Sequence, residues 1–329
     1  MTKAIRVVCV SLSVLAATFG ATSSGNAECT GTNCVYVIRI VVPAGAGGAT
    51  DMVARTIAPS LERQLGRRII VENIPGAGGA AGTQRVMDAA PDGTTLLMLN
   101  TSTAVNTAIY EKQKIDIVRD LVPIAGVARI PEILVTAPSM PAKTVSELVA
   151  YAKNNPGKVG IASAGRGSPS QLAGELLTTK TGINARHIPF QGSVPAMVGV
   201  AADETLITFV PAVDMSIDRI KSGQLRALGI TGTARLPALP DVPTMAETIP
   251  AYNASGWIGL VAPKNTRPDF AEQLNRAVNA ALAEPGIKEQ LVRIGATVVM
   301  ESPADFGKLI ADETEKWTEV TKAMGSKAQ

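Results

Sequence analysis

The chain has 329 residues, a length typical of about two domains, and its 46% hydrophobic content can fill sizeable cores. The formal net charge is +3 and aromatic residues make up 3%, without a basic stripe, so we expect no binding to nucleic acid. One histidine and three cysteines leave little material for metal or histidine-based chemistry, and we expect no metal and no cofactor.

The first 27 residues have the organisation of a secretory signal peptide. Lys3 and Arg6 precede an apolar stretch of about a dozen residues, too short to cross a bilayer as a helix, and small residues follow up to Ala27. We expect cleavage near Ala27 and a periplasmic product. The alternative is a buried N-terminal helix.

Export changes the interpretation of the cysteines. Cys9 is removed with the signal peptide, and Cys29 and Cys34 remain as a closely spaced pair. In an oxidising compartment such a pair predicts a small local disulfide. The alternative is two free thiols at a frayed terminus.

Short apolar segments alternate with helical patterns along the rest of the chain. Continuous apolar strands bounded by Gly or Pro are typical of parallel sheets covered on both faces. Strands are expected at 35–42, 68–73, 95–100, 159–163, 205–210, 225–231 and 257–262, and helices at 51–65, 144–154, 168–180, 269–283 and 303–323. In the last helix, the spacing of Phe306, Leu309, Ile310 and Trp317 makes Trp317 a core residue that docks the C-terminus. The alternation predicts an α/β fold.

Two segments share one design, a strand followed by a glycine-rich turn and a helix, at 41–51 and 161–171. Ser168, Pro169 and Gln171 mark the second helix start as N-cap, first helical residue and capping-box partner. A third glycine-rich turn covers 75–79. Backbone N–H groups and helix N-termini at such turns bind carboxylates or phosphates. The alternative is that the glycines only make tight turns.

Enzyme motifs are weak or absent. Residues 76–81 fit a dinucleotide-binding fingerprint, but no acidic residue about 20 positions on ends the next strand. The P-loop pattern is missing, and the segment 160–165 is one residue too long for a nucleophile elbow. His187 is more simply a structural or rim residue than a general base.

Two charged residues have several uses. The sequence leaves four roles open for Asp51: a favourable interaction with the dipole of its helix, an ion pair with Arg55, support of its own loop, or contact with a ligand ammonium group. Arg166 reaches a second carboxylate of a ligand or is a solvated loop residue.

Taken in order, these motifs resemble those of the Bug family, the periplasmic solute receptors of tripartite tricarboxylate transporters. The resemblance covers about the whole chain after residue 27. It is carried by residues 40–43, 47–48, 51, 54–55, 71–73, 75–79, 91–96, 155–158, 167–168, 171–175, 223–228, 241–244, 247, 257–260 and 262–263.

The resemblance implies two Rossmann-like lobes joined by two crossing strands, a type II periplasmic-binding-protein fold that closes on a small carboxylate. The crossings would lie near 124–131 and 255–261. After a signal peptide at 1–27, the first lobe would comprise 28–125 and 256–329 and the second lobe 126–255. The ligand-binding residues expected from the loops and the resemblance are Ala44, Gly45, Ala46, Gly47, Gly48, Thr50, Asp51, Thr101, Ser102, Ser163, Gly165, Arg166, Gly167, Ser168, Gln171, Phe190, Gln191 and Val210.

Some positions depart from the family pattern. The family often has histidine where Gln171 stands and Tyr-Lys-Gly at 190–192, and an acidic residue often stands at Val210. Loss of that acid weakens the case for a ligand with an ammonium group and favours a plain organic acid.

We therefore expect a monomeric receptor without catalysis that delivers a small organic acid to the membrane components of a transporter. One alternative is a sensor of the same fold without its own transporter. Another is an exported α/β enzyme, for which no nucleophile and base pair is evident.

Overall fold

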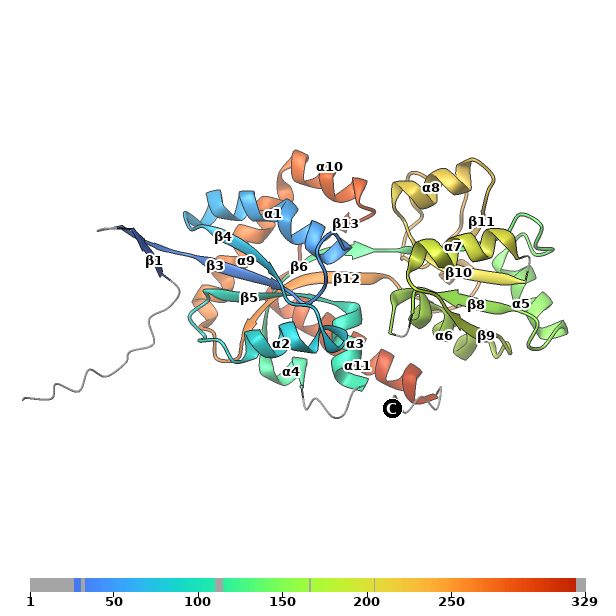
Figure 1. Cartoon of the computed structure of the whole chain (residues 1–329), viewed down its shortest axis with the longest axis horizontal. Coiled ribbons are helices and arrows are strands. Elements are labelled where there is room, and N and C mark those ends of the chain that lie inside the picture. Colours follow the sequence, from blue (N-terminus) through green and yellow to red (C-terminus); the bar gives the residue numbers. More distant parts are fainter. Residues whose placement is uncertain (1–26, 31–32, 110–114, 166, 204, 324–329) are drawn as a thin grey trace, which may run out of the picture.

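The computed structural model describes residues 27–30, 33–109, 115–165, 167–203 and 205–323. Apart from Ala27, the predicted signal peptide lies outside these residues, as does Arg166. Two separate sheets organise the described chain into two lobes, which lie end to end in Figure 1.

The first lobe is built on a six-stranded sheet. β3 runs parallel to β4 and β5, whereas β12 is antiparallel to both β5 and β6. The carboxyl ends of β3, β4 and β5 therefore meet at one edge, where open α/β sheets place ligand-binding loops. In spatial order the strands are β13 (Thr297–Val298), β6 (Leu121–Ile130), β12 (Gly256–Pro263), β5 (Thr95–Asn100), β3 (Ile38–Val42) and β4 (Ile69–Asn73).

The second lobe is built on a five-stranded sheet of the same mixed kind. β8 runs parallel to β9 and β10, and β7 is antiparallel to β10 and β11. In each sheet, the three strands that are connected by helices run parallel to one another. The antiparallel pairs of the two sheets all involve β6, β7 or β12, the strands at or next to the crossings between the lobes. In spatial order the strands are β11 (Arg226–Ile230), β7 (Glu132–Thr136), β10 (Leu206–Pro211), β8 (Gly160–Ser163) and β9 (Arg186–Pro189).

Two neighbouring strands lead the chain from one lobe to the other. β6 and β12 pair along their whole length, with Gly256 opposite Ile130 and Pro263 opposite Leu121. The chain leaves the first sheet at Pro131, because β7 begins at the next residue, and it returns just before Gly256. This pairing keeps 126–130 in the six-stranded sheet. The lobe boundaries at 125/126 and 255/256 stay a prediction.

Helices cover both faces of the first sheet (Figure 1). α1 (Ala49–Leu65), α9 (Pro268–Ala283) and α10 (Pro285–Arg293) bury apolar side chains on one face. α2 (Ala80–Met87), α3 (Thr101–Ile109), α4 (Ile117–Asp120) and the start of α11 (Pro303–Ala323) lie on the other face. The short 3-10 helix η1 (Ala77–Gly79) leads into α2.

The second lobe repeats this arrangement and includes the end of the chain's last helix. α5 (Val145–Asn154) and α6 (Pro169–Thr181) cover one face, and α7 (Ser193–Ala202) and α8 (Asp214–Lys221) cover the other. A 3-10 turn, η3 (Met245–Glu247), packs beneath β11. Trp317 and Val320 of α11 belong to the core of this lobe, whereas Phe306 and Ile310 belong to that of the first. α11 therefore contributes to both cores.

The described chain begins with a hairpin of β1 (Ala27–Thr30) and β2 (Asn33–Tyr36). The antiparallel register places Cys29 directly opposite Cys34. Cα atoms of directly opposed strand residues lie in the range that a disulfide bridges. The disulfide itself stays a prediction.

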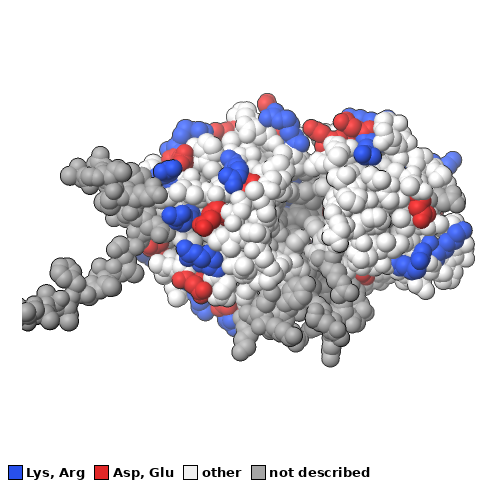
Figure 2. Space-filling view, in the orientation of Figure 1, with Lys and Arg blue, Asp and Glu red and all other residues white. Residues whose placement is uncertain are grey.

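Charged side chains are mixed over the surface. On the face shown in Figure 2, Lys and Arg alternate with Asp and Glu over both lobes, and no continuous basic stripe is visible among the described residues. None of the described helices is long and apolar enough to span a membrane.

Candidate functional site

A cavity of about 480 Å³ lies between the two lobes. Its volume falls within the range usual for sites of small molecules. Loops of both sheets form its walls, and the crossing strands form its floor with Ile130, Gly256, Trp257 and Ile258. The cavity is therefore placed where a ligand would touch both lobes at once.

The N-terminal ends of five helices line this cavity. The residues concerned are Ala49 and Thr50 of α1, Gly79 before α2, Thr101 to Thr103 of α3, Pro169 and Ser170 of α6, and Ser193 of α7. N–H groups in the first turn of a helix lack partners within the helix, and the dipole places partial positive charge there. The walls thus favour an anion, although no Lys or Arg lines the cavity among the described residues.

Asp51 organises the first glycine-rich loop. Its carboxylate accepts hydrogen bonds from Gly47 N (2.9 Å), Arg55 Nε (2.9 Å) and Asn73 Nδ2 (2.9 Å). Asn73 Nδ2 also donates to Ala44 O, which ties β4 to the same loop. Burial opposes ionisation, but these bonds outweigh it and hold the pKa of Asp51 below its usual value. Of the uses predicted for Asp51, the structure shows the pair with Arg55 and the support of its own loop.

The second glycine-rich loop is held by its own side chains. Ser168 caps α6 by accepting from Gln171 N (3.3 Å), as predicted, and its hydroxyl donates to Gly165 O (2.6 Å). Gln171 Oε1 accepts from Gly167 N (2.7 Å) instead of the backbone of the N-cap residue, so the expected capping box is altered. Ser170 Oγ accepts from Ala164 N (2.9 Å). Backbone donors of this loop are therefore used largely within it.

The third glycine-rich turn, at 75–79, also lines the cavity. Gly79 has φ of +99°, and a Cβ there would lie 2.4 Å from Thr103 Oγ1. Only glycine fits this position, since both the backbone conformation and the contact with α3 exclude a side chain. Asn106 Nδ2 donates to Gly78 O (3.2 Å) and fixes the turn to the same helix. The sequence showed this turn, but we did not include it among the expected ligand-binding residues.

The floor holds the one titratable residue that lines the cavity within the described chain, Glu132. Sequence reasoning missed it and looked for an acid at Val210 instead. Val210 is fully buried in the core of the second lobe, while its neighbour Pro211 lines the cavity opposite Glu132 on the adjacent strand. The cavity thus contains an acidic residue supplied by β7 instead of β10.

Apart from Arg166, which lies outside the described residues, and the buried Val210, the expected ligand-binding residues divide into three groups. Ala44, Thr50, Thr101 and Ser102 line the cavity directly. Phe190 packs against the core of the second lobe, and Gln191 is exposed. Those that belong to the two loops or their helices without lining the cavity are Gly45, Ala46, Gly47, Gly48, Asp51, Ser163, Gly165, Gly167, Ser168 and Gln171.

His187 and Ser163 form a pair that the sequence did not indicate. Ser163 Oγ lies 2.7 Å from His187 Nε2 and accepts from Gly165 N (3.2 Å). Ser163 is completely buried and does not line the cavity. The contacts of this hydroxyl therefore position the loop that follows β8. Among the described residues, no group of three or more His, Cys, Asp or Glu could hold a metal ion.

Comparison with known proteins identifies the family. Residues 53–326 match the model of the tripartite tricarboxylate transporter family receptor. The BugT protein of Bordetella pertussis is 38% identical over 298 residues, which cover 88% of this chain and 90% of BugT.

Two solved structures from Rhodopseudomonas palustris are similar in sequence and shape. MatC with bound malate is 31% identical with a TM-score of 0.71, over 86% of this chain and 98% of MatC. A second protein, solved with adipate, is 30% identical with a TM-score of 0.73, over 88% of this chain and 97% of its own. The chain belongs to the tripartite tricarboxylate transporter family of receptors, the family that its sequence motifs indicated.

Proposed function

We propose that this chain is an extracytoplasmic receptor that captures a small organic acid between its lobes and delivers it to the membrane components of a tripartite transporter. The observation that carries the proposal is the cavity between the lobes, lined by the N-terminal ends of five helices. Partial positive charge from both lobes favours the binding of a carboxylate. The bound carboxylate in turn favours the closed state, because a ligand shifts the population toward the state in which it makes more contacts.

The relatives support this assignment. Receptors of this family are periplasmic binding proteins, and two similar structures hold the dicarboxylates malate and adipate. Cleavage near Ala27 would leave a periplasmic monomer. Its lobes would be 28–125 with 256–329 and 126–255, and its Gly-rich loops would face the ligand together with Arg166.

Two alternative functions use the same cavity. A sensor without its own transporter would bind the acid equally well but would not support uptake. An exported enzyme would need a nucleophile that reaches the ligand, and the Ser163 hydroxyl, although paired with His187, is buried away from the cavity. We therefore favour capture and release of an unchanged acid.

Binding is tested by calorimetry with malate and adipate on two matched variants. Ala49→Asp places a negative charge at the first residue of α1, where it suits the helix dipole but faces the cavity. Gly286→Asp places the same charge in the exposed first turn of α10, away from the cavity. We expect Ala49→Asp to weaken binding at least about tenfold and Gly286→Asp to leave it unchanged.

Delivery is tested in cells that lack the gene for this chain. Uptake of labelled acid should return with the wild-type gene and with Gly286→Asp, but not with Ala49→Asp. Uptake that is unaffected by the deletion would favour the sensor. Recovery of a chemically altered acid from the purified protein would favour the enzyme.

A further inference from the structure

A second cavity, of about 720 Å³, lies beside the crossings between the lobes. Arg129 and Pro131 line it, whereas Ile130 between them lines the first cavity. At the return crossing, Ser255 lines the second cavity and Gly256 lines the first. Successive residues of an extended chain face opposite sides, so the two cavities lie on opposite sides of the crossings. The second cavity is therefore separate from the site described above.

Both lobes form the walls of the second cavity, and most of these walls are apolar. The first lobe contributes Val292 of α10 and Val298 of β13, and the second lobe contributes Ile217 of α8 and Leu236 of the loop after β11. Figure 1 shows α10 and α8 at the same edge of the molecule, one on each lobe. Val292 is 64% exposed, so an apolar ligand finds uncovered surface here. Apolar walls and a volume of this size are typical of sites for small molecules.

The charged residues that line the second cavity are all basic. They are Arg129, Arg235 and Lys288, and no Asp or Glu lines the cavity among the described residues. Arg129 pairs with Glu301 (2.6 Å) and Arg235 with Glu247 (2.6 Å). The ammonium group of Lys288 is exposed and has no ion pair within the described chain. One positive charge is thus left for a ligand, and the lining complements an anion with an apolar body.

The two lobes already touch at the edge of this cavity. Gly295 follows α10 in the first lobe, and Ala212 follows β10 in the second; both line the cavity. Gly295 has φ of +75°, and a Cβ there would lie 2.5 Å from Ala212 O. The walls therefore move with the lobes. Because the cavities lie on opposite sides of the crossings, a hinge rotation that widens the first cavity narrows the second.

We propose that the second cavity is a separate binding site for a fatty acid, and that its occupation favours the open state of the first cavity. The carboxylate of the fatty acid pairs with Lys288, and its alkyl chain lies against Val292 and the facing apolar wall of the second lobe. Lys288 and Val292 lie one turn apart on the same face of α10.

The fatty acid gains contacts when the walls of the second cavity approach each other, so it favours the rotation that opens the first cavity. It therefore weakens binding of the acid held there, and by linkage that acid weakens binding of the fatty acid equally. This coupling rests on the receptor function proposed above, whereas the second site itself does not.

The test uses calorimetry with decanoate as the fatty acid and decyltrimethylammonium as an amphiphile of equal chain length and opposite charge. Lys288→Glu reverses the charge at the second cavity. Arg293→Glu makes the same change at an exposed position of the same helix that does not line the cavity. Ala49→Asp, introduced above, disables the first cavity only.

We expect wild type to bind decanoate at least about tenfold more tightly than decyltrimethylammonium. Lys288→Glu should weaken decanoate binding about tenfold, while Arg293→Glu and Ala49→Asp should leave it unchanged. Saturating decanoate should weaken binding of malate or adipate to wild type by at least about fivefold and then reach a plateau, because coupling through the hinge is finite. Lys288→Glu should need about tenfold more decanoate for the same effect.

Three results would overturn the second site or its coupling. Loss of decanoate binding in Ala49→Asp but not in Lys288→Glu would place the fatty acid in the first cavity. Equal binding of decanoate and decyltrimethylammonium would mean unspecific apolar adsorption. Weakening of adipate binding that grows without a plateau would mean direct competition. If malate and adipate do not bind but decanoate follows the expected pattern of variants, the receptor function falls and the second site stands.

Discussion

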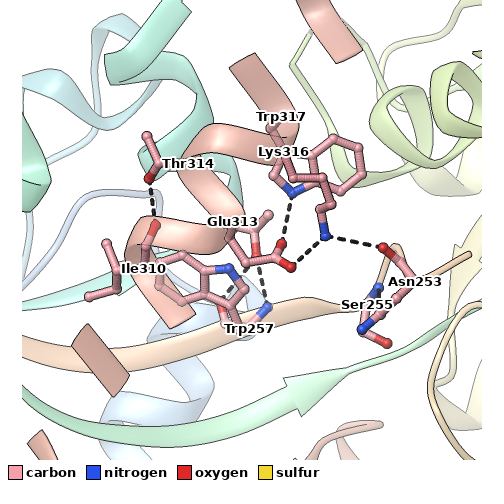
Figure 3. Close-up of polar contacts among 9 residues, drawn as sticks. Asn253, Ser255, Trp257, Ile310, Glu313, Thr314, Lys316 and Trp317 are labelled. Atoms are coloured by element: carbon pink, nitrogen blue, oxygen red, sulfur yellow. Dashed lines mark hydrogen bonds and ion pairs between the residues drawn. The ribbon is translucent and has the colours of Figure 1, made fainter. Parts of the chain in front are cut away.

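Helix α11 begins in the first lobe, and Trp317 near its end packs into the second lobe. Phe306 packs near the start of α11 in the first lobe, whereas Trp317 lies 1% exposed in the core of the second. Figure 3 shows its indole Nε1 donating to Glu313 (2.8 Å), which also pairs with Lys316. Replacement by alanine should therefore destabilise the second lobe.

The expected magnitude follows from burial. An aromatic side chain of this size buries about 150–250 Å². At about 25 cal/mol per Å² this is worth about 4–6 kcal/mol, an upper bound, and core truncations of aromatic residues cost about 3–5 kcal/mol. We expect Trp317→Ala to lower the free energy of unfolding by about 4 kcal/mol. Trp317→Phe keeps most of the apolar area but loses the bond to Glu313, so about 1.5–3 kcal/mol is expected.

Denaturant unfolding of these variants measures the effect. The chain has two tryptophans, so Trp317→Ala leaves Trp257 as the sole indole reporter, within the first lobe. For Trp317→Ala, circular dichroism should show an unfolding transition at a lower denaturant concentration than the change in Trp257 fluorescence, which reports on the first lobe. Lys308→Ala on the exposed side of the same helix removes only an ion pair with Asp312 and should cost less than about 1 kcal/mol. A cost for Trp317→Ala no greater than that of Lys308→Ala would refute the reasoning.

Four further outcomes are expected. Gly167→Ala should destabilise by at least about 1–2 kcal/mol, because φ there is +72° and the new Cβ would lie 2.4 Å from Asn106 Oδ1. Gly48→Ala, at φ of −76°, should be nearly neutral, and thermal melts that rank the two variants the other way would contradict the geometry. Burial raises the pKa of Glu132 to about 8, so between about pH 4.5 and 8 the native state holds a proton on Glu132 that the unfolded state loses. Wild-type stability should therefore fall by up to about 1.4 kcal/mol per pH unit relative to Glu132→Gln, and parallel pH profiles would count against it. Saturation with adipate should reduce the radius of gyration in small-angle scattering, and an identical profile would argue against closure. Protein from the periplasm should show no free thiol at Cys29 or Cys34, and two titratable thiols would disprove the disulfide.

Local patterns in the sequence predicted some of the elements closely, but the strands β1, β7 and β13 and the helices α2, α3, α4, α7, α8 and α10 were not among those named. The helix predicted at 303–323 occupies Pro303–Ala323, and the strand predicted at 95–100 occupies Thr95–Asn100. These segments combine a clear hydrophobic period with Gly, Pro or a capping residue at their ends. β9 (Arg186–Pro189) was missed, because an exposed edge strand of four residues has no such pattern.

The cavity floor could not be predicted in the same way. Glu132 opens an apolar strand, a position where an acid usually meets solvent. Only the passage of β6 and β12 beneath the two lobes buries it in the same cavity that Trp257 lines. The loops of the walls were recognisable because glycine next to a helix start is a local signal. A polar group on a floor formed by strands more than a hundred residues apart has none.

The last helix also constrains how the lobes can close. Phe306 and Trp317 lie in different cores but on one rigid helix, about 16 Å apart along its axis. Beside this helix, Lys316 Nζ donates to Asn253 O (3.1 Å) just before the second crossing strand, as Figure 3 shows. The lobes are thus joined by β6, β12 and α11, and any rotation that widens the cavity must bend the strands without pulling Trp317 out of its core. Opening by a small hinge rotation at Pro131 and at the residues before Gly256 meets this condition, whereas wide separation of the lobes would cost the several kcal/mol of Trp317 burial. Helix α11 therefore limits how far the two lobes can separate.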